Sequence, residues 1–268
     1  MLKSEGVDTT NLSFAVADLT KADGWDEAMG NIDYVLHVAS PLGGDNHDDP
    51  GLIPIAKSGV KNVLNAAVKA GIKKVVMTSS AAACFPEKSN ANPALDETFW
   101  TDINNKYTTN YMCSKLVAEQ TASDIIGKQT TTKLTTILPS AILGPYMDGK
   151  RSSTGQIFEM ILKGTPSPNV VYGVVDVRDL AELHILAMES DKADGERFLG
   201  VSEEMTMPEM AKYLKNELGN NGNKISTIVI PNFLIGIMAK FSAPMKVLNS
   251  MVGFKYHHSN KKALTVLN

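Results

Sequence analysis

Val75-Val76-Met77-Thr78-Ser79-Ser80 is an apolar run that ends in hydroxyl groups, and Tyr111-Met112-Cys113-Ser114-Lys115 follows it along the chain. A short apolar run of this kind is typical of a strand buried on both faces of a parallel sheet. Tyr111 and Lys115 are four residues apart, so on a helix their side chains leave from the same face. The two stretches predict a strand end and a helix face that share one site.

The residue types at this site suit proton transfer to a carbonyl oxygen. A tyrosine phenol normally has a pKa near ~10, and a lysine ammonium close to it favours the phenolate and lowers that pKa. Such a tyrosine can exchange a proton with a carbonyl oxygen near neutral pH. A serine hydroxyl at the neighbouring strand end, Ser79 or Ser80, can hydrogen-bond the same oxygen. The combination predicts a hydride-transfer site.

Spacing alone does not establish this interpretation, because Tyr146 and Lys150 are also four residues apart. That second pair follows Gly144-Pro145 and contains a further glycine, so it is predicted to lie in a loop. Tyr111 instead opens a run without glycine or proline that continues to Ile126. On the pair alone, a purely structural role for Tyr111 as a half-buried core tyrosine stays open.

Predicted strands and helices alternate along the first half of the chain. The strands are predicted at residues 12–16, 34–38, 75–78 and 134–138, and the helices at residues 52–70 and about 106–126. This alternation predicts βαβ units in an α/β fold with a doubly wound parallel sheet of the Rossmann type. Ligands of such sheets bind beyond the carboxyl ends of the strands. The common rim is expected to hold Ala39-Ser40-Pro41, Ser79-Ser80 and Pro139-Ser140.

Residues 151–268 have a mixed pattern. Helices are predicted at residues 153–162, 176–188 and 207–218, and strands at residues 170–172, 198–199 and 225–230. The expected organisation is a dinucleotide-binding domain of residues 1–150 and a smaller, interleaved substrate-binding lobe of residues 151–268. Asp176 and Asp179 stand where a helix begins, and a structural role as cap and first-turn carboxylate is expected for both.

Composition excludes several classes of protein. A net charge of −3 and a pI near 6.0 give no electrostatic footprint for nucleic acid or for an anionic membrane. The two cysteines, Cys84 and Cys113, cannot make a disulfide framework and fit a reducing cytoplasm. Neither has the spaced partners of a metal site, so no metal is predicted. The longest apolar region, residues 225–238, is interrupted by Pro231 and is too short to span a bilayer.

Several further motifs occur in an order that resembles one family, the extended short-chain dehydrogenases/reductases. Within it the chain is similar to the dihydroflavonol-reductase-like branch, which includes aldehyde and methylglyoxal reductases. The matching segments cover most of the chain: Ala17-Asp18-Leu19, Val35 to Pro41, Gly59 to Leu64, Thr78 to Ala81, Tyr111 to Lys115, Leu138-Pro139-Ser140 with Gly144-Pro145, and Val175 to Ala181.

The resemblance implies a role for individual residues. Tyr111 would be the acid/base, Lys115 would tune its pKa and bind the nicotinamide ribose, and Ser80 would orient the carbonyl, with Ser79 as the second choice. The cofactor would be NADP or NAD. Its remaining contacts would be Asp18 and Leu19 beside the adenine, Ala39, Ser40, Pro41 and Ser79 along the groove, and Pro139 and Ser140 on the nicotinamide side. Asn62 and residues 176–179 are expected to be architectural.

One departure from the family is large, because the 268 residues contain no G-x-x-G-x-x-G or G-x-G-x-x-G segment. This segment cradles the pyrophosphate in the family. We therefore expect an N-terminally truncated Rossmann sheet in which Leu12–Val16 has lost its neighbour and would lie three strand spacings, about 14 Å, from Tyr34–Val38. Residues up to about Gly30 should then pack irregularly, or another chain should supply strands. Tyr34–Val38 should become an exposed apolar edge that favours self-association.

Three functions are compatible with these residues. The first is an NAD(P)-dependent reductase of a small-molecule aldehyde or ketone, whose activity in this chain is in doubt because the phosphate cradle is missing. The second is a nucleotide-sugar epimerase or dehydratase, which uses the same Tyr/Lys pair but needs basic residues for the diphosphate. Arginine occurs only at positions 151, 178 and 197, which disfavours it. The third is a non-catalytic remnant or a redox-sensing binding protein.

Overall fold

The strands that carry the predicted site residues lie side by side in the computed structural model. The structure describes residues 6–42, 48–85, 94–105, 108–145, 153–241, 245, 248–249, 251–253 and 257–268. The second Tyr/Lys pair, at Tyr146 and Lys150, lies outside these residues, as does the start of the helix predicted from about residue 106.

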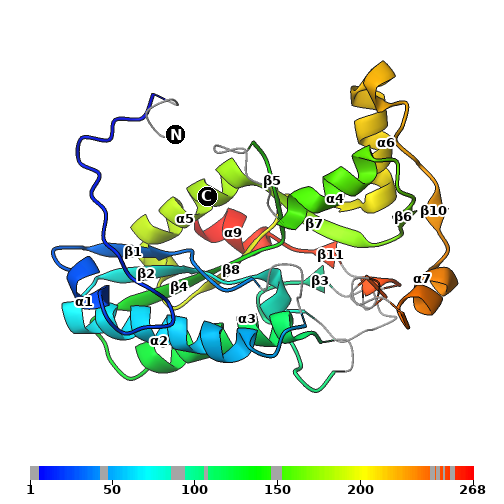
Figure 1. Cartoon of the computed structure of the whole chain (residues 1–268). Helices are drawn as coiled ribbons and strands as arrows, with labels where there is room; N and C mark the ends of the chain where they lie inside the picture. The colour runs from blue at the N-terminus through cyan, green and yellow to red at the C-terminus, as the bar shows by residue number, and fades with distance from the viewer. Residues whose placement is uncertain are drawn as a thin grey trace.

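Four parallel strands form the main sheet, in the order β1-β2-β4-β8. They are β1 (Tyr34–His37), β2 (Lys74–Thr78), β4 (Lys133–Pro139) and β8 (Arg197–Gly200). Helices α2 (Leu52–Ala70) and α3 (Asn110–Ile126) cover one face, and α5 (Val177–Glu189) and α9 (Lys261–Val266) lie on the other (Figure 1). The predicted α/β fold with a Rossmann-type parallel sheet is confirmed.

Apolar side chains hold the two helical layers to the sheet. On one side Val63 and Leu64 of α2 pack in a buried cluster with Val75 of β2 and Ala118 of α3. On the other, Leu180 and Ala187 of α5 are buried with Ile137 and Phe198. Burial on both faces explains why these strands read as near-continuous apolar runs.

Local signals set the ends of the helices. Helix α2 ends at Gly71, which has a left-handed φ of 71° and donates its N–H to the carbonyls of Ala67 and Val68. Helix α3 begins at Asn110, later than predicted, because the Thr109 side chain accepts from the Met112 N–H and caps the helix there. Asp176 caps α5 in the same way through the Arg178 N–H, as expected.

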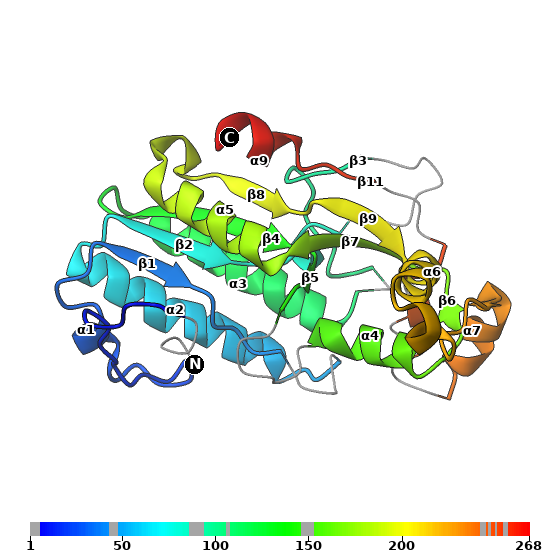
Figure 2. The same ribbon diagram turned by 90° about the horizontal axis from the view of Figure 1, so that it is seen from above.

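The second half of the chain adds smaller sheets. Strands β5 (Ala141–Leu143), β7 (Val171–Asp176) and β9 (Glu203–Thr206) form one, with β5 parallel and β9 antiparallel to β7 (Figure 2). The pairs β6 (Ser167–Pro168) with β10 (Val229–Ile230) and β3 (Ala94–Leu95) with β11 (His257–His258) form two more. The remaining elements are α4 (Ser153–Leu162), α6 (Met207–Glu217), α7 (Asn232–Met238) and the short turns η2 (Ala81–Ala83), η3 (Asp191–Ala193) and η4 (Gly219–Gly222).

These elements interleave the two halves of the chain. Strand β8 lies beyond residue 150 but belongs to the main sheet, whereas β5 precedes residue 150 and pairs with β7. The strand predicted at residues 225–230 is shorter than expected, and only β10 pairs within it. The division into domains at residue 150 stays a prediction. Within the described residues, none of the helices has both the length and the apolar character that crossing a bilayer requires.

The N-terminal segment departs from the predicted pattern. Leu12–Val16 is not a strand: it forms no ladder with any described residue, and Phe14 and Val16 are 89% and 93% exposed. A strand needs a neighbour to satisfy its N–H and C=O groups, so without one the apolar pattern alone does not produce it. The expected irregular packing is confirmed for the described part of this segment, in which residues 6–24 form neither helix nor strand before α1 (Trp25–Ala28) (Figure 1).

The end of this segment is nevertheless fixed to α2. The Asn62 side-chain amide donates to the carbonyls of Leu19 at 2.9 Å and Lys21 at 3.0 Å. Leu19 and Trp25 pack against the buried cluster beneath α2, and Asp26 pairs with Lys69. Asn62 therefore joins an irregular segment to a regular helix, as its expected architectural role requires.

Strand β1 ends the sheet order and is exposed along its outer side. Tyr34, Leu36 and Val38 are 42%, 44% and 61% exposed. The expected exposed apolar edge is thus present.

We predict that Asn62→Ala lowers the free energy of unfolding by about 1–2 kcal/mol, because two side-chain hydrogen bonds to backbone carbonyls are lost. Urea denaturation measures the change, and limited proteolysis should show faster cleavage near Lys21. Asn65→Ala, an exposed position on the same helix, is the matched control and should change stability by less than about 0.5 kcal/mol. Equal effects of the two substitutions would contradict the anchoring role.

Candidate active site

The predicted rim is formed by the carboxyl ends of three neighbouring strands. His37 of β1 is in register with Met77 of β2, and Thr78 of β2 is in register with Ile137 of β4. The strands point the same way (Figure 2). The segments that follow them, residues 39–41, 79–80 and 139–140, therefore leave the sheet at one edge.

Helix α3 brings two side chains to this edge. The Tyr111 hydroxyl hydrogen-bonds the Ser80 side chain beyond β2. Lys115 Nζ lies 5.5 Å from the centroid of the Tyr111 ring and donates to Ser40 Oγ at 2.8 Å. Residues from two strand ends and one helix, Ser40, Ser80, Tyr111 and Lys115, thus form one polar group.

Burial controls the protonation of this group. Desolvation raises the pKa of Tyr111, and the hydrogen bond from Ser80 only partly opposes that effect. The lowering of the Tyr111 pKa that was expected from Lys115 is therefore wrong for this structure, in which Lys115 Nζ bonds Ser40. Burial also lowers the pKa of Lys115 to about 8. The same desolvation favours the neutral form of both side chains.

The hydroxyls at the end of β2 have different partners. Ser80 Oγ accepts from the Ala82 N–H at 3.1 Å and meets Tyr111. Ser79 is 4% exposed, and its Oγ donates to Glu119 Oε2 at 2.7 Å. Thr78 Oγ1 contacts His184 Nε2 at 2.7 Å. Ser80 is thus the serine that the fold turns toward Tyr111, and the Ser79 hydroxyl faces the interior.

Four of the predicted cofactor residues line one narrow hollow beside β1 and β2. Leu19, Ala39, Ser40 and Pro41 form its wall together with His37, Ala56, Gly59, Val60, Met77 and Thr78. Its volume is about 10 Å³, room for about one water molecule. Leu19 closes it by packing on Gly59, where an added Cβ would lie 3.2 Å from Leu19 Cβ.

The other predicted cofactor residues are not among those that line this hollow. Asp18 is exposed, and its carboxylate accepts from the N–H and hydroxyl of Thr20, which lowers the pKa of Asp18. Pro139 is buried at the end of β4. The Ser140 N–H donates to the Gly200 carbonyl at 3.1 Å, and Ser140 Oγ lies 2.8 Å from where a Cβ on Gly173 would be.

Two titratable residues near the site were not among the predicted site residues; of these, His37 was expected only as a core residue of its strand. His37 is 6% exposed, and burial, with a contribution from the Lys115 charge, lowers its pKa to about 4. Glu119 is fully buried and bonds Ser79. A signal for Glu119 was available, because it follows Tyr111 and Lys115 at the same four-residue spacing.

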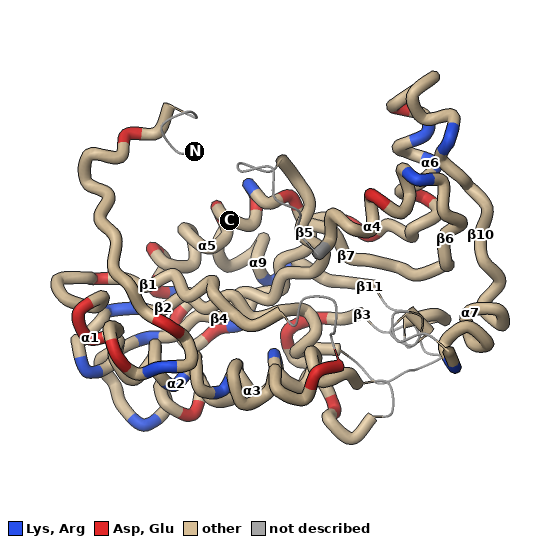
Figure 3. Tube along the Cα trace, viewed as in Figure 1, with Lys and Arg blue, Asp and Glu red and all other residues tan. Residues whose placement is uncertain are grey.

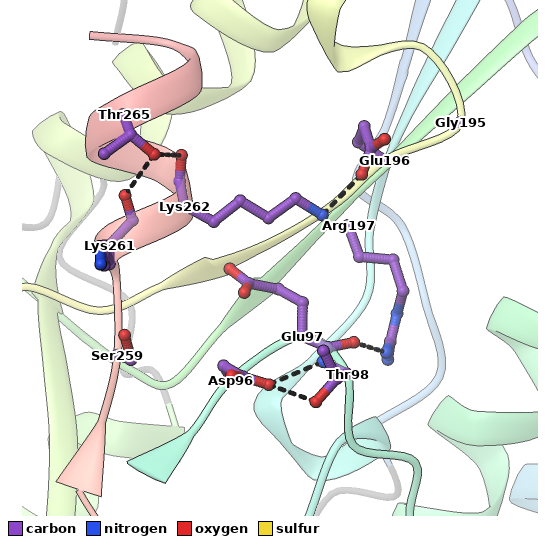
Figure 4. A pocket seen from close by; sticks show the side chains of 10 residues that line it. All are labelled: Asp96, Glu97, Thr98, Gly195, Glu196, Arg197, Ser259, Lys261, Lys262 and Thr265. Carbon is purple, nitrogen blue, oxygen red and sulfur yellow. Dashed lines mark hydrogen bonds and ion pairs between the residues drawn. The ribbon is translucent and has the colours of Figure 1, made fainter.

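A larger cavity, of about 420 Å³, lies beside β8 (Figure 4). Its lining is charged and none of the predicted site residues belongs to it: Asp96, Glu97, Thr98, Gly195, Glu196, Arg197, Ser259, Lys261, Lys262 and Thr265. An ion pair of 2.6 Å between Lys262 and Glu196 crosses it. No group of three or more His, Cys, Asp or Glu side chains in the described ranges could hold a metal ion.

A parallel sheet with serine, tyrosine and lysine gathered at its carboxyl edge defines a Rossmann-type α/β protein. Residues 3–199 match the model of the NAD dependent epimerase/dehydratase family, and the chain belongs to that family. The resemblance found in the sequence is confirmed.

Comparison with known proteins places reductases among the relatives. Cinnamoyl-CoA reductase 1 of Oryza sativa subsp. japonica is 36% identical over 220 residues, which are 80% of this chain and 63% of that protein. An oxidoreductase of Schizosaccharomyces pombe, described as putative and uncharacterized, is 30% identical and covers 90% of this chain and 76% of its own length. Gre2 from Candida albicans in complex with NADPH superposes with a TM-score of 0.80 at 28% identity, covering 99% and 81% of the two chains.

The coverage of the plant enzymes is partial. The chain spans 63% of the rice cinnamoyl-CoA reductase and 56% of the Petunia hybrida enzyme.

We predict that His37 makes the free energy of unfolding decrease as the pH falls below 6.5. Its pKa is about 4 in the folded chain and 6.5 ordinarily, so protons bind the unfolded chain preferentially between these values. His37 has no such effect above pH 6.5. As the pH falls toward 4, it lowers the free energy of unfolding by up to about 3 kcal/mol. Urea unfolding of the wild type and of His37→Leu at several pH values measures it. The variant should lose less stability over that interval, and parallel curves would contradict the assignment.

Proposed function

We propose that this chain is an NAD(P)-dependent oxidoreductase that reduces a small-molecule aldehyde or ketone by hydride transfer. The observation that carries the proposal is the hydrogen bond between the hydroxyls of Ser80 and Tyr111 at the carboxyl edge of the sheet, with Lys115 beside them. Two hydroxyls that already face each other can converge on one carbonyl oxygen.

The chain's own residues would handle the proton. Ser80 would orient the substrate oxygen, and Tyr111 would donate a proton to it as the carbon–oxygen double bond is reduced to an alcohol. Burial raises the pKa of Tyr111, which keeps the phenol protonated at neutral pH and so in the form that reduction requires. The reduced nicotinamide, when bound, supplies the hydride that reaches the carbonyl carbon.

Lys115 and Ser40 are suited to the nicotinamide end of that cofactor. Lys115 Nζ and Ser40 Oγ lie 2.8 Å apart at the rim, and this pair suits the hydroxyls of the nicotinamide ribose. The hollow beside β1 and β2 is too small for a dinucleotide at about 10 Å³, so Leu19 would have to withdraw for further contacts there. NADPH is the cofactor form favoured, because the Candida albicans neighbour was solved with it.

Relatives support reduction over the epimerase alternative. Cinnamoyl-CoA reductase 1 and anthocyanidin reductase are 36% and 30% identical to this chain. No observation at the site favours a nucleotide-sugar substrate. A cytoplasmic location is part of the proposal, since Cys84 and Cys113 are both free thiols.

We predict that Tyr111→Phe lowers kcat by roughly 100-fold or more, because the proton donor is lost. NADPH oxidation is followed at fixed cofactor with a panel of aliphatic and aromatic aldehydes and ketones. Cofactor affinity, measured by nicotinamide fluorescence, should stay unchanged. Tyr213→Phe is the control, because Tyr213 is 59% exposed on α6.

Three results would count against the proposal. Absence of NADH and NADPH binding up to millimolar concentration would favour a non-catalytic remnant. Interconversion of nucleotide sugars without net cofactor oxidation would favour the epimerase. Full activity of Tyr111→Phe would show that Tyr111 is not the proton donor.

We also propose that β1 pairs with a second copy of the chain, since its exposed apolar residues end the sheet. Leu36→Lys places a charge on that edge and should convert a dimer to a monomer in light scattering coupled to size exclusion. Leu264→Lys on α9, where the leucine is 62% exposed, is the control and should leave the mass unchanged. A wild type that is monomeric at tens of micromolar concentration would overturn this proposal.

A further inference from the structure

A buried carboxylate lies on the same face of α3 as the candidate catalytic pair. Glu119 follows Tyr111 and Lys115 at four-residue intervals and is 0% exposed. Its Oε2 accepts from Ser79 Oγ at 2.7 Å, and its Oε1 accepts from Thr136 Oγ1 at 3.0 Å. The carboxylate therefore connects α3 to the end of β2 and to the interior of β4.

Arg197 of β8 fixes this carboxylate. Its Nε donates to Glu119 Oε1 at 2.6 Å, and the two side chains are 13% and 1% exposed. The guanidinium also donates to the Glu97 carbonyl (Figure 4). It donates to the Phe99 carbonyl as well and stacks 3.7 Å from the centroid of the Trp100 ring. A buried ion pair is tolerated only when its remaining donors and acceptors are satisfied, and here both partners are held on several sides.

The hydrogen bond to Ser79 acts directly beside the candidate site. The Ser79 N–H donates to the Ile137 carbonyl at 2.7 Å, so both backbone and side chain of Ser79 are fixed. The next residue, Ser80, caps η2: its carbonyl accepts from the Ala83 N–H at 2.9 Å, and its hydroxyl faces Ala82 and Tyr111. Because Ser79 immediately precedes Ser80, the bonds that hold Ser79 to the sheet also limit where the Ser80 hydroxyl can lie.

We propose that Glu119, held by Arg197, is a positioning residue that fixes the Ser80 hydroxyl opposite Tyr111 by bonding Ser79. Helix α3 then holds Tyr111 directly and Ser80 indirectly, through Glu119 and Ser79. Tyr111 meets Ser80 from the first turn, and Glu119 holds the preceding serine two turns later. The role in turnover rests on the proposed function, whereas the geometric role does not.

Thr136 offers a matched comparison. It donates to the same carboxylate as Ser79 but to the other oxygen, and it belongs to β4 rather than to the end of β2. Both hydroxyls are buried, at 2% exposure for Thr136 and 4% for Ser79. Removing either one therefore takes a similar buried hydrogen bond from Glu119, but only the Ser79 change removes a side-chain tie next to Ser80.

The test is carbon-13 NMR of tyrosine labelled at the ζ carbon, whose resonance reports hydrogen bonding of the phenol. The Tyr111 resonance is assigned by its loss in Tyr111→Phe, and Ser80→Ala shows its position without the serine partner. Ser79→Ala should move the resonance toward that position, and Glu119→Gln should do the same. Thr136→Val should leave the Tyr111 resonance at the wild-type position, although it should lower the thermal midpoint of unfolding by about as much as Ser79→Ala does.

Ser79→Ala keeps the test decisive if Glu119→Gln fails to fold, because it leaves the ion pair with Arg197 intact. In an active wild type, Ser79→Ala should also lower kcat by roughly 10- to 100-fold with little change in KM. An unshifted resonance in Ser79→Ala, or an equal shift in Thr136→Val, would overturn the positioning role. A wild type without turnover would count against the proposed function only, since the NMR comparison needs no activity.

Discussion

Parallel pairing of β1, β2 and β4 is the constraint on which the rest of the structure depends. Parallel strands with aligned registers end at one edge, so the segments at positions 40, 80 and 140 leave the sheet together although they are far apart in sequence. Helix α3 adds Tyr111 and Lys115 because it packs over the same sheet. Basic and acidic residues are interspersed along the chain (Figure 3). Geometry rather than net charge gathers the site.

Burial then determines the chemistry of the gathered groups. The phenol, the ammonium and the imidazole at positions 111, 115 and 37 all shift toward their neutral forms. A charged neighbour competes with this effect only when it is very close and points at the group. Tyr111 and Lys115 therefore contribute their hydrogen bonds to Ser80 and Ser40, and desolvation sets the protonation states of both side chains.

Much of this arrangement could be predicted from local sequence. Apolar runs and the Gly71 signal located β1, β2 and α2, because burial on two faces and a left-handed C-cap leave local traces. The Leu12–Val16 strand was wrong since strand formation depends on a neighbour that the run itself does not encode. Glu119 escaped because its partner Arg197 is 78 residues away. The raised pKa of Tyr111 likewise depends on packing that spacing does not reveal.

The contact between Leu19 and Gly59 has a consequence for affinity. Any molecule that enters the hollow must displace the Leu19 side chain, so Leu19 competes with that molecule for the same space. The apparent dissociation constant then equals the intrinsic one divided by the fraction of molecules with Leu19 withdrawn. Docking of a partly buried leucine stabilises by about 1.5 kcal/mol, which raises the apparent dissociation constant about tenfold. Leu19, whose carbonyl Asn62 binds, would thereby weaken the apparent affinity for any molecule that uses this hollow.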